Sequence, residues 1–362
     1  MQRWSFNYRL FFKKNMVGLA VLAIFGISVV SWDSGLLLKS MALSEVMPKS
    51  RVTFNALTQI YAAEKETRVT TKTKEGEELE SDGQDKEPVK VDPGTLFVMS
   101  DDEKLNYSDV NYLKKNLYIV DARTDLLDGE INGEKFINMD FSLNNENDGP
   151  KILIFHTHSH ESFADSNMTL GKEEGIVGVG EHLKEILEND YGIETMHCTE
   201  SFDYVDSKMT TTGAYERMEP VIEKILKDNP SIEIAIDLHR DGIGDDTKKL
   251  VTEVNGKQTA QIMFFNGLCR VYDNGNLIPT AGLENPNLEQ NLAFSFNMKY
   301  AGDKLFPGFV RRNYLNAYRY SLNMLPKSLL VEVGAQTNTK DEAMNAMEPL
   351  AEILVNVINK NT

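Results

Sequence analysis

The chain has 362 residues, of which 41% are hydrophobic and 26% charged, the composition of an ordinary globular protein. Its formal net charge is -17 at neutral pH, whereas nucleic-acid binding requires clustered Lys and Arg that displace counterions from phosphates. We therefore expect no nucleic-acid partner.

The N-terminus has the pattern of a membrane anchor. Residues 1–15 are basic and contain no acidic side chain, and Met16 to Trp32 is free of charge. As a helix this run would be about 25 Å long, close to the hydrocarbon thickness of a bilayer. The positive-inside rule then predicts a cytoplasmic stub and transmembrane anchor over 1–32, with the catalytic domain extracytoplasmic. A cleaved signal peptide is the alternative, although the run ends in a poor cleavage site.

Two further segments separate this anchor from the main domain. Residues 33–95 are predicted to be a juxtamembrane segment and flexible linker, because Glu64 to Pro93 is highly charged and lacks aromatic residues. Within residues 96–150, the short apolar runs 117–122 and 136–141 are separated by glycines. This pattern predicts a small β-rich subdomain.

From residue 151 onward, strand-like and helix-like patterns alternate. Apolar runs predict strands, and apolar residues three and four apart predict helices. Thr339 and Glu342 have the spacing of a capping box at the start of the last helix. Residues 151–362 are therefore expected to form an α/β domain with a mixed or parallel sheet flanked by helices. The expected strands are 152–155, 232–238, 260–265 and 329–333, and the longest expected helix is 288–305.

Polar residues lie at the ends of three of these strands. The first strand runs into the segment His156 to Glu161, the second into His239 and Arg240, and the third contains Glu332. Because ligands of open α/β sheets bind outside the carboxyl ends of the strands, these groups are expected to converge.

The residue types at this edge suit catalytic zinc. Such an ion takes three protein ligands from His, Glu and Asp and leaves a fourth position for water. His158 and Glu161 supply two ligands from one turn, and His239 supplies a third. Glu332 is the candidate for the separate carboxylate that accepts and returns the proton of the water. The alternative without a metal is that His156, His158 and His160 merely share one face of an extended segment.

Three other features have less specific interpretations. His182 and His197 are expected to be ordinary structural histidines, because neither has a ligand-spaced partner. The glycines of Gly175-x-x-Gly178-x-Gly180 do not follow the dinucleotide-binding order and are interpreted as a loop before a helix. Arg240 either stabilises an oxyanion or substrate carboxylate, or forms a structural salt bridge with Asp237 or Asp241.

The sequence resembles the stage II sporulation protein P cell-wall hydrolases of endospore-forming bacteria. The matching stretches are ILIFHTHSHESF (152–163), VGVGEHL (177–183), NPSIEIAIDLHRDGIG (229–244), FPGFVRR (306–312) and LLVEVGAQTNTKDEA (329–343). The resemblance implies a fold similar to the zinc N-acetylmuramoyl-L-alanine amidases. It further implies cleavage of the bond between muramic acid and the stem peptide, and of peptide cross-links, during engulfment of the forespore. The implied cofactor is Zn²⁺, and the implied partners are peptidoglycan, the sporulation transglycosylase D and other engulfment membrane proteins.

Carried over residue by residue, the resemblance places zinc ligation on His158, Glu161 and His239 and general base catalysis on Glu332. The family motif has two histidines before its Glu, so His156 stays open as the first ligand, and the His at position 160 adds a third. Glu173 and Glu174 are alternative acidic ligands, because related amidases take theirs just before the first helix.

Two rival functions remain. A zinc carboxypeptidase-like peptidase would also use a His-x-x-Glu pair, a later His and a still later Glu, and would need Arg240, Arg311 or Arg312 to hold a terminal carboxylate. An anchored wall-binding scaffold with a decayed zinc site is the other. Digestion of purified peptidoglycan separates the amidase from the carboxypeptidase, because an amidase releases intact stem peptides and a carboxypeptidase releases only terminal residues.

Overall fold

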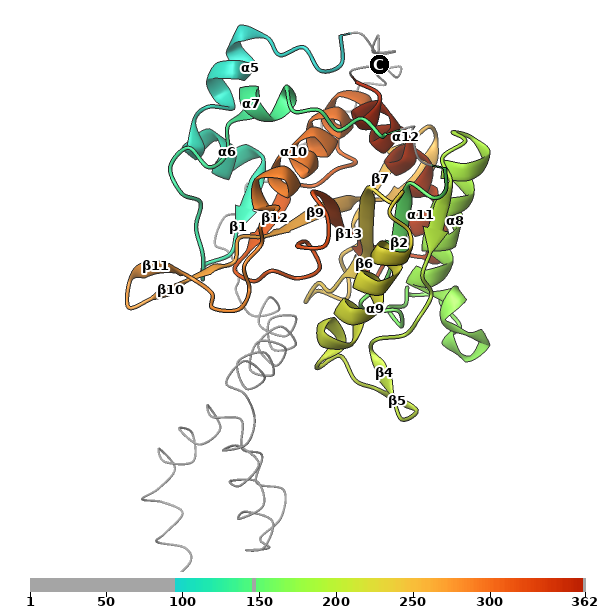
Figure 1. Ribbon diagram of the computed structural model, residues 1–362. Helices are drawn as coiled ribbons and strands as arrows, with labels where there is room; N and C mark the ends of the chain where they lie inside the picture. Colours follow the sequence, from blue (N-terminus) through green and yellow to red (C-terminus); the bar gives the residue numbers. More distant parts are fainter. Residues whose placement is uncertain (1–94, 145–147, 361–362) are drawn as a thin grey trace, which may run out of the picture. The chain divides into compact units, whose positions relative to one another are not determined.

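The computed structural model describes residues 95–144 and 148–360, all within one compact unit (Figure 1). The predicted anchor, the linker up to residue 94 and the alternative signal peptide lie outside the described residues. The helices are α5 Asp101–Asn106, α6 Val110–Asn116, α7 Gly133–Ile137, α8 Ile176–Asn189, α9 Ala214–Asp228, α10 Leu288–Leu305, α11 Lys340–Asn345 and α12 Met347–Ile358, with the short 3-10 helices η1 Met168–Leu170 and η2 Lys172–Glu174.

The predicted single-pass membrane localisation is contradicted. Across residues 95–144 and 148–360, the chain has no helix that combines the length and the apolar character needed to cross a bilayer.

The described part of the chain forms a seven-stranded sheet in the order β1-β12-β9-β13-β6-β2-β3. All neighbouring strands are parallel except β13 and β9, which are antiparallel. The predicted mixed or parallel α/β sheet is therefore confirmed. The strands of this sheet are β1 Tyr118–Val120, β2 Ile152–Phe155, β3 Thr195–His197, β6 Ile234–Asp241, β9 Ile262–Gly267, β12 Asn313–Asn316 and β13 Lys327–Ala335.

Strand alternation divides the sheet into two different faces. Ile234, Ile236 and Leu238 of β6 pack into the main core together with apolar residues of α8, α10, α11 and α12, and Figure 1 shows these helices grouped along the sheet. Asp237 and His239 alternate with these residues and therefore point to the opposite face. On that face a smaller core contains Met263 of β9 among its members.

The described part of the segment 96–150 contains more helix than strand, so it is not the predicted β-rich subdomain. It holds the short helices α5, α6 and α7, and strand β1 within it pairs in parallel with β12 of the main sheet. Local capping decides the outcome over 136–141. Asn132 accepts a hydrogen bond from Lys135 N and starts α7, in which Phe136 and Ile137 are buried.

Other local predictions are confirmed. Helix α10 and strand β2 have the predicted bounds. The Thr339 side chain accepts from Glu342 N, and Glu342 accepts from Thr339 N, so the capping box is present. The last helix is broken, however, because α11 ends at Asn345 and α12 begins at Met347.

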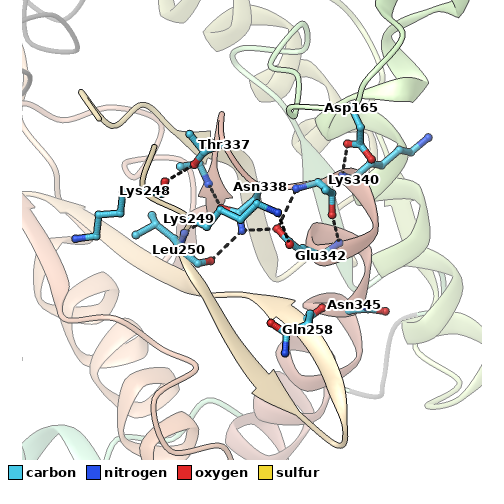
Figure 2. Close-up of polar contacts among 12 residues, drawn as sticks. Asp165, Lys248, Lys249, Leu250, Gln258, Thr337, Asn338, Lys340, Glu342 and Asn345 are labelled. Atoms are coloured by element: carbon cyan, nitrogen blue, oxygen red, sulfur yellow. Dashed lines mark hydrogen bonds and ion pairs between the residues drawn. The ribbon is translucent and has the colours of Figure 1, made fainter. Parts of the chain in front are cut away.

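Asn338 ties the end of β13 to a separate hairpin, β7 Val251–Val254 and β8 Lys257–Ala260. Its buried side chain accepts from Ala335 N (2.9 Å) and donates to Leu250 O (3.1 Å) and Glu342 Oε2 (2.8 Å). Figure 2 shows the contacts around it, with Lys340 N bonded to Asp165 nearby. These bonds fix the chain three residues beyond β13.

Two further hairpins leave the sheet, β4 Tyr204–Val205 with β5 Lys208–Met209, and β10 Arg270–Asp273 with β11 Asn276–Pro279. Figure 1 shows them projecting at separate places from the body of the domain. Neither hairpin was predicted from the sequence.

Candidate active site

His239 and Glu332 lie side by side at the carboxyl end of the sheet. His239 is on β6, Glu332 is on β13, and the two are register partners on these parallel strands. Neighbouring strands are about 4.8 Å apart and register partners share a face, so the two side chains are neighbours. Both are buried.

His158 and Glu161 reach the same place from the turn after β2. The rings of His158 and His239 have centroids 5.4 Å apart. Glu161 Oε2 lies 3.5 Å from Nδ1 of His239 and accepts a hydrogen bond from Arg240 N at 2.7 Å. The four residues predicted for metal binding and proton transfer therefore meet at one buried edge of the sheet.

Asp237 fixes the orientation of His239. Nε2 of His239 donates to Asp237 Oδ1 at 2.7 Å, and Asp237 also accepts from the backbone N and Oγ1 of Thr157. Burial tends to lower the pKa of His239, but the adjacent Asp237 and Glu161 outweigh it and raise this pKa well above its ordinary value.

The other two histidines of the motif have different partners. His156 Nδ1 donates to Leu238 O at 2.7 Å, and its Nε2 lies 2.8 Å from Nε2 of His197. Burial and His197 lower the pKa of His156 to about 3. His160 Nδ1 donates to Asp203 Oδ1 at 2.8 Å. Of the three, His158 is the one whose ring packs against His239.

One of the two alternative acidic ligands has another partner, because Glu174 pairs with Lys340 at 3.2 Å. Glu161 rather than Glu174 approaches His239, and helix α8 holds Glu161 in place because Ile176 N donates to Glu161 O at 2.9 Å.

The comparisons with known proteins identify the family of the chain. The family model described as stage II sporulation protein P matches residues 35–355. The chain belongs to the stage II sporulation protein P family. A curated member, stage II sporulation protein P of Bacillus subtilis (strain 168), is 23% identical over 219 residues, which are 56% of this chain and 49% of that protein. The chain thus aligns with about half the length of this relative.

Several solved amidases resemble the chain remotely. The CwlD amidase of Clostridioides difficile, solved in complex with the GerS lipoprotein, is 11% identical with a TM-score of 0.35, over 58% of this chain and 95% of that one. Ami1 of Mycobacterium abscessus is 15% identical with a TM-score of 0.32, over 58% and 98%. The catalytic domain of CwlV from Bacillus (Paenibacillus) polymyxa is 14% identical with a TM-score of 0.32, over 57% and 96%. Similarity this remote assigns no activity.

The residues at this edge fit zinc by type. Within residues 95–144 and 148–360, no group of three or more His, Cys, Asp or Glu side chains is already arranged as a metal site. Yet His239 Nδ1 and Glu161 Oε2 are 3.5 Å apart, close to the roughly 3.3 Å that separates two ligand atoms of one tetrahedral zinc. Asp237 binds the other ring nitrogen, as carboxylates do behind zinc-binding histidines.

Arg240 contributes its backbone to the site. Within the described residues, its guanidinium makes one hydrogen bond, to Asp241 O at 3.2 Å, while the Asp241 carboxylate pairs with Arg311. Asp237 is bonded to His239. Neither salt bridge suggested for Arg240 is therefore formed. Strand alternation directs its side chain away from the face that carries His239.

The glycine motif lies in helix α8, so its interpretation as a loop is wrong. Gly175 is the N-cap, and Gly178 and Gly180 lie within the helix. A Cβ on Gly175 would lie 2.3 Å from Glu161 O, and one on Gly180 would lie 2.7 Å from the His156 ring. The motif is thus explained by the close approach of α8 to the segment that carries the site.

Sequence reasoning missed two contributors to the site. Asp237 was considered only as a partner of Arg240, although its spacing of two from His239 on a strand puts both on one face. Tyr215 of α9 packs edge-on against His158, with ring centroids 5.8 Å apart. No sequence signal links these two residues, which are brought together only by the packing of α9 against the sheet.

Proposed function

We propose that the chain is a zinc-dependent peptidoglycan hydrolase that cleaves the amide bond between N-acetylmuramic acid and the stem peptide during sporulation. Membership of the stage II sporulation protein P family supports the substrate class. One structural observation supports the chemistry most directly. His239 has Glu161 on one ring nitrogen, Asp237 on the other, and Glu332 beside it on the next strand.

The proposed roles follow from these positions. His158, Glu161 and His239 would hold the ion, which when bound supplies Lewis-acid activation of water and of the scissile carbonyl. Asp237 orients His239 through Nε2, which leaves Nδ1, on the side of Glu161, as the nitrogen that would bind the ion. The Glu332 carboxylate accepts the proton of the attacking water and passes it to the nitrogen of the leaving stem peptide.

Arg240 is proposed to bind a substrate carboxylate. This role is supported by the lack of a carboxylate partner for its guanidinium within the described residues, whereas the carboxylate of the adjoining Asp241 pairs with Arg311. Because its side chain leaves the face of β6 opposite His239, this contact would lie away from the proposed metal ligands.

The cleavage of peptide cross-links and cooperation with a sporulation transglycosylase D-like enzyme are further parts of this proposal. A transglycosylase that shortens glycan strands would supply chain ends to an amidase. Co-purification of the two proteins at physiological salt, with no recovery of the transglycosylase on resin alone, would support the partnership. Absence of any complex in co-purification and in cross-linking would contradict the partnership.

Digestion of purified peptidoglycan tests the activity. We expect the zinc-loaded full chain to release intact stem peptides and leave muramic acid with a free lactyl carboxylate, both detected by mass spectrometry. Release of single terminal amino acids would instead indicate a carboxypeptidase. Binding to the wall without any soluble product would indicate a scaffold.

A further inference from the structure

The β4–β5 hairpin is held rigidly beside the candidate active site. Its preceding residue, Asp203, is buried and accepts hydrogen bonds from Ser159 Oγ (2.9 Å), His160 N (3.0 Å) and His160 Nδ1 (2.8 Å). His160 directly precedes Glu161 in the chain. The hairpin is therefore anchored to the same segment that carries the proposed metal ligands.

A second anchor holds the base of the hairpin. The guanidinium of Arg217, on α9, donates to three backbone carbonyls, Phe202 O at 2.6 Å, Thr210 O at 2.6 Å and Thr212 O at 3.0 Å. A two-stranded hairpin is only marginally stable by itself. The contacts of Asp203 and Arg217 give this one a fixed position.

The tip of the hairpin is a tight turn. Asp206 and Ser207 form the two-residue turn, and both have positive φ (49° and 63°), as in the tight turns that match the twist of paired strands. Asp206 of the turn and Lys208, which follows it, are exposed and carry opposite charges. The tip thus offers no net charge to an ionic ligand.

These anchors hold an aromatic surface open to solvent. Tyr204 and Met209 are cross-strand partners with 45% and 57% of their surface exposed. The ring of His160 stacks on Tyr204, with centroids 4.7 Å apart and an interplanar angle of 21°. We call His160, Tyr204 and Met209 the hairpin platform. The three side chains form a contiguous exposed surface beside the segment that carries the proposed metal ligands.

We infer that the hairpin platform binds a sugar ring of the glycan strand next to the bond that is cleaved. A pyranose presents an apolar C–H face, which suits the electron-rich face of an aromatic ring. It carries no charge and so needs none from the hairpin, whereas stem peptides carry carboxylates. The inference deepens the proposed function and rests on it for the identity of the substrate.

Binding of a peptide-free glycan tests the inference without relying on catalysis. The probe is an N-acetylglucosamine tetrasaccharide, titrated into the full chain by calorimetry. We expect Tyr204→Ala to weaken its binding roughly tenfold and Tyr204→Phe, which keeps the ring, to preserve most of it. Tyr272→Ala is the matched control, because Tyr272 has the same 45% exposure on the other hairpin, β10–β11. It should bind as the unaltered chain does.

Three results would overturn the inference. They are no binding of the tetrasaccharide by the unaltered chain, equal binding by Tyr204→Ala, and a loss in Tyr204→Ala of affinity for isolated stem peptides instead of glycan. Thermal unfolding of each variant confirms that it is folded. Peptidoglycan digestion by the same proteins separates this inference from the proposed function. If the unaltered chain binds glycan through Tyr204 but hydrolyses nothing, the platform stands and the proposed activity fails.

Discussion

Glu332 and His239 occupy paired positions on the parallel strands β13 and β6. Their side chains therefore leave the same face of the sheet, next to the turn that carries His158 and Glu161. Because this pairing is set by strand register, the proton-accepting carboxylate and the proposed metal ligand are positioned by the rigid centre of the fold rather than by a loop.

Replacing Glu332 by Gln should remove catalysis without removing substrate binding. The amide keeps the shape of the side chain but cannot accept a proton, so we expect kcat to fall by about 10²- to 10⁴-fold with wall binding unchanged. Release of stem peptides and pelleting with purified wall measure the two effects. The control is Glu253→Gln, at an exposed position on β7. Full activity in Glu332→Gln would remove this residue from the mechanism.

Asp237→Asn should weaken metal binding through His239. The carboxylate accepts the Nε2–H of His239, and loss of such a partner typically costs about 10- to 100-fold in metal affinity. Competition for zinc with a chelator measures the change in the full chain. Ser328→Ala, a buried polar substitution on β13 away from the histidines, controls for general disturbance of the sheet. An unchanged zinc affinity in Asp237→Asn would contradict the positioning role of Asp237.

Asn338→Ala should destabilise the fold. The buried amide bonds to Ala335, Leu250 and Glu342, and a small apolar side chain leaves these groups unsatisfied. We expect a loss of about 2–4 kcal/mol in the free energy of unfolding, since each unsatisfied buried group costs roughly 1–3 kcal/mol. Denaturant unfolding measures it. Asn276→Ala, in the exposed part of β11, should change the value little, and an equal effect of both variants would argue against this network.

Lys360 should make stability depend on pH in the alkaline range. Its ammonium lies over the rings of Phe97 and Phe141, and burial lowers its pKa to about 8. The unfolded chain, with a Lys pKa of about 10.4, binds more protons than the folded one between these values, so stability rises with pH there. Between pH 8 and 10, the unaltered chain should gain thermal stability relative to Lys360→Met. A constant or falling difference would contradict the lowered pKa.

The sequence predicts the elements whose local signals agree with their tertiary setting. The run Ile152 to Phe155 is buried on both faces, and the α10 pattern is long, so their bounds are correct. The segment 96–150 shows the opposite case, because the short apolar run 136–141 suggested a strand where a cap at Asn132 starts a helix. The β4–β5 hairpin is held by hydrogen bonds of Asp203 and Arg217 that join residues distant in the sequence. Patterns within a short stretch of sequence therefore do not predict it.

The sequence likewise predicts part of the candidate site and misses the rest. Strand ends were enough to bring His158, Glu161, His239 and Glu332 together, since the carboxyl ends of parallel strands share an edge. The choice among three histidines needed coordinates, because only side-chain packing directs His156 to His197 and His160 to Asp203. The glycines of α8 also depend on close packing, which no pattern of glycines reveals.

The metal content of the purified full chain tests the central claim most directly. Elemental analysis after exhaustive dialysis should find close to one zinc per chain, and His239→Ala should retain almost none. His182→Ala, at a partly exposed position on α8, should retain it all. A chain free of zinc after loading, or a His239→Ala variant with as much zinc as its parent, would contradict the account.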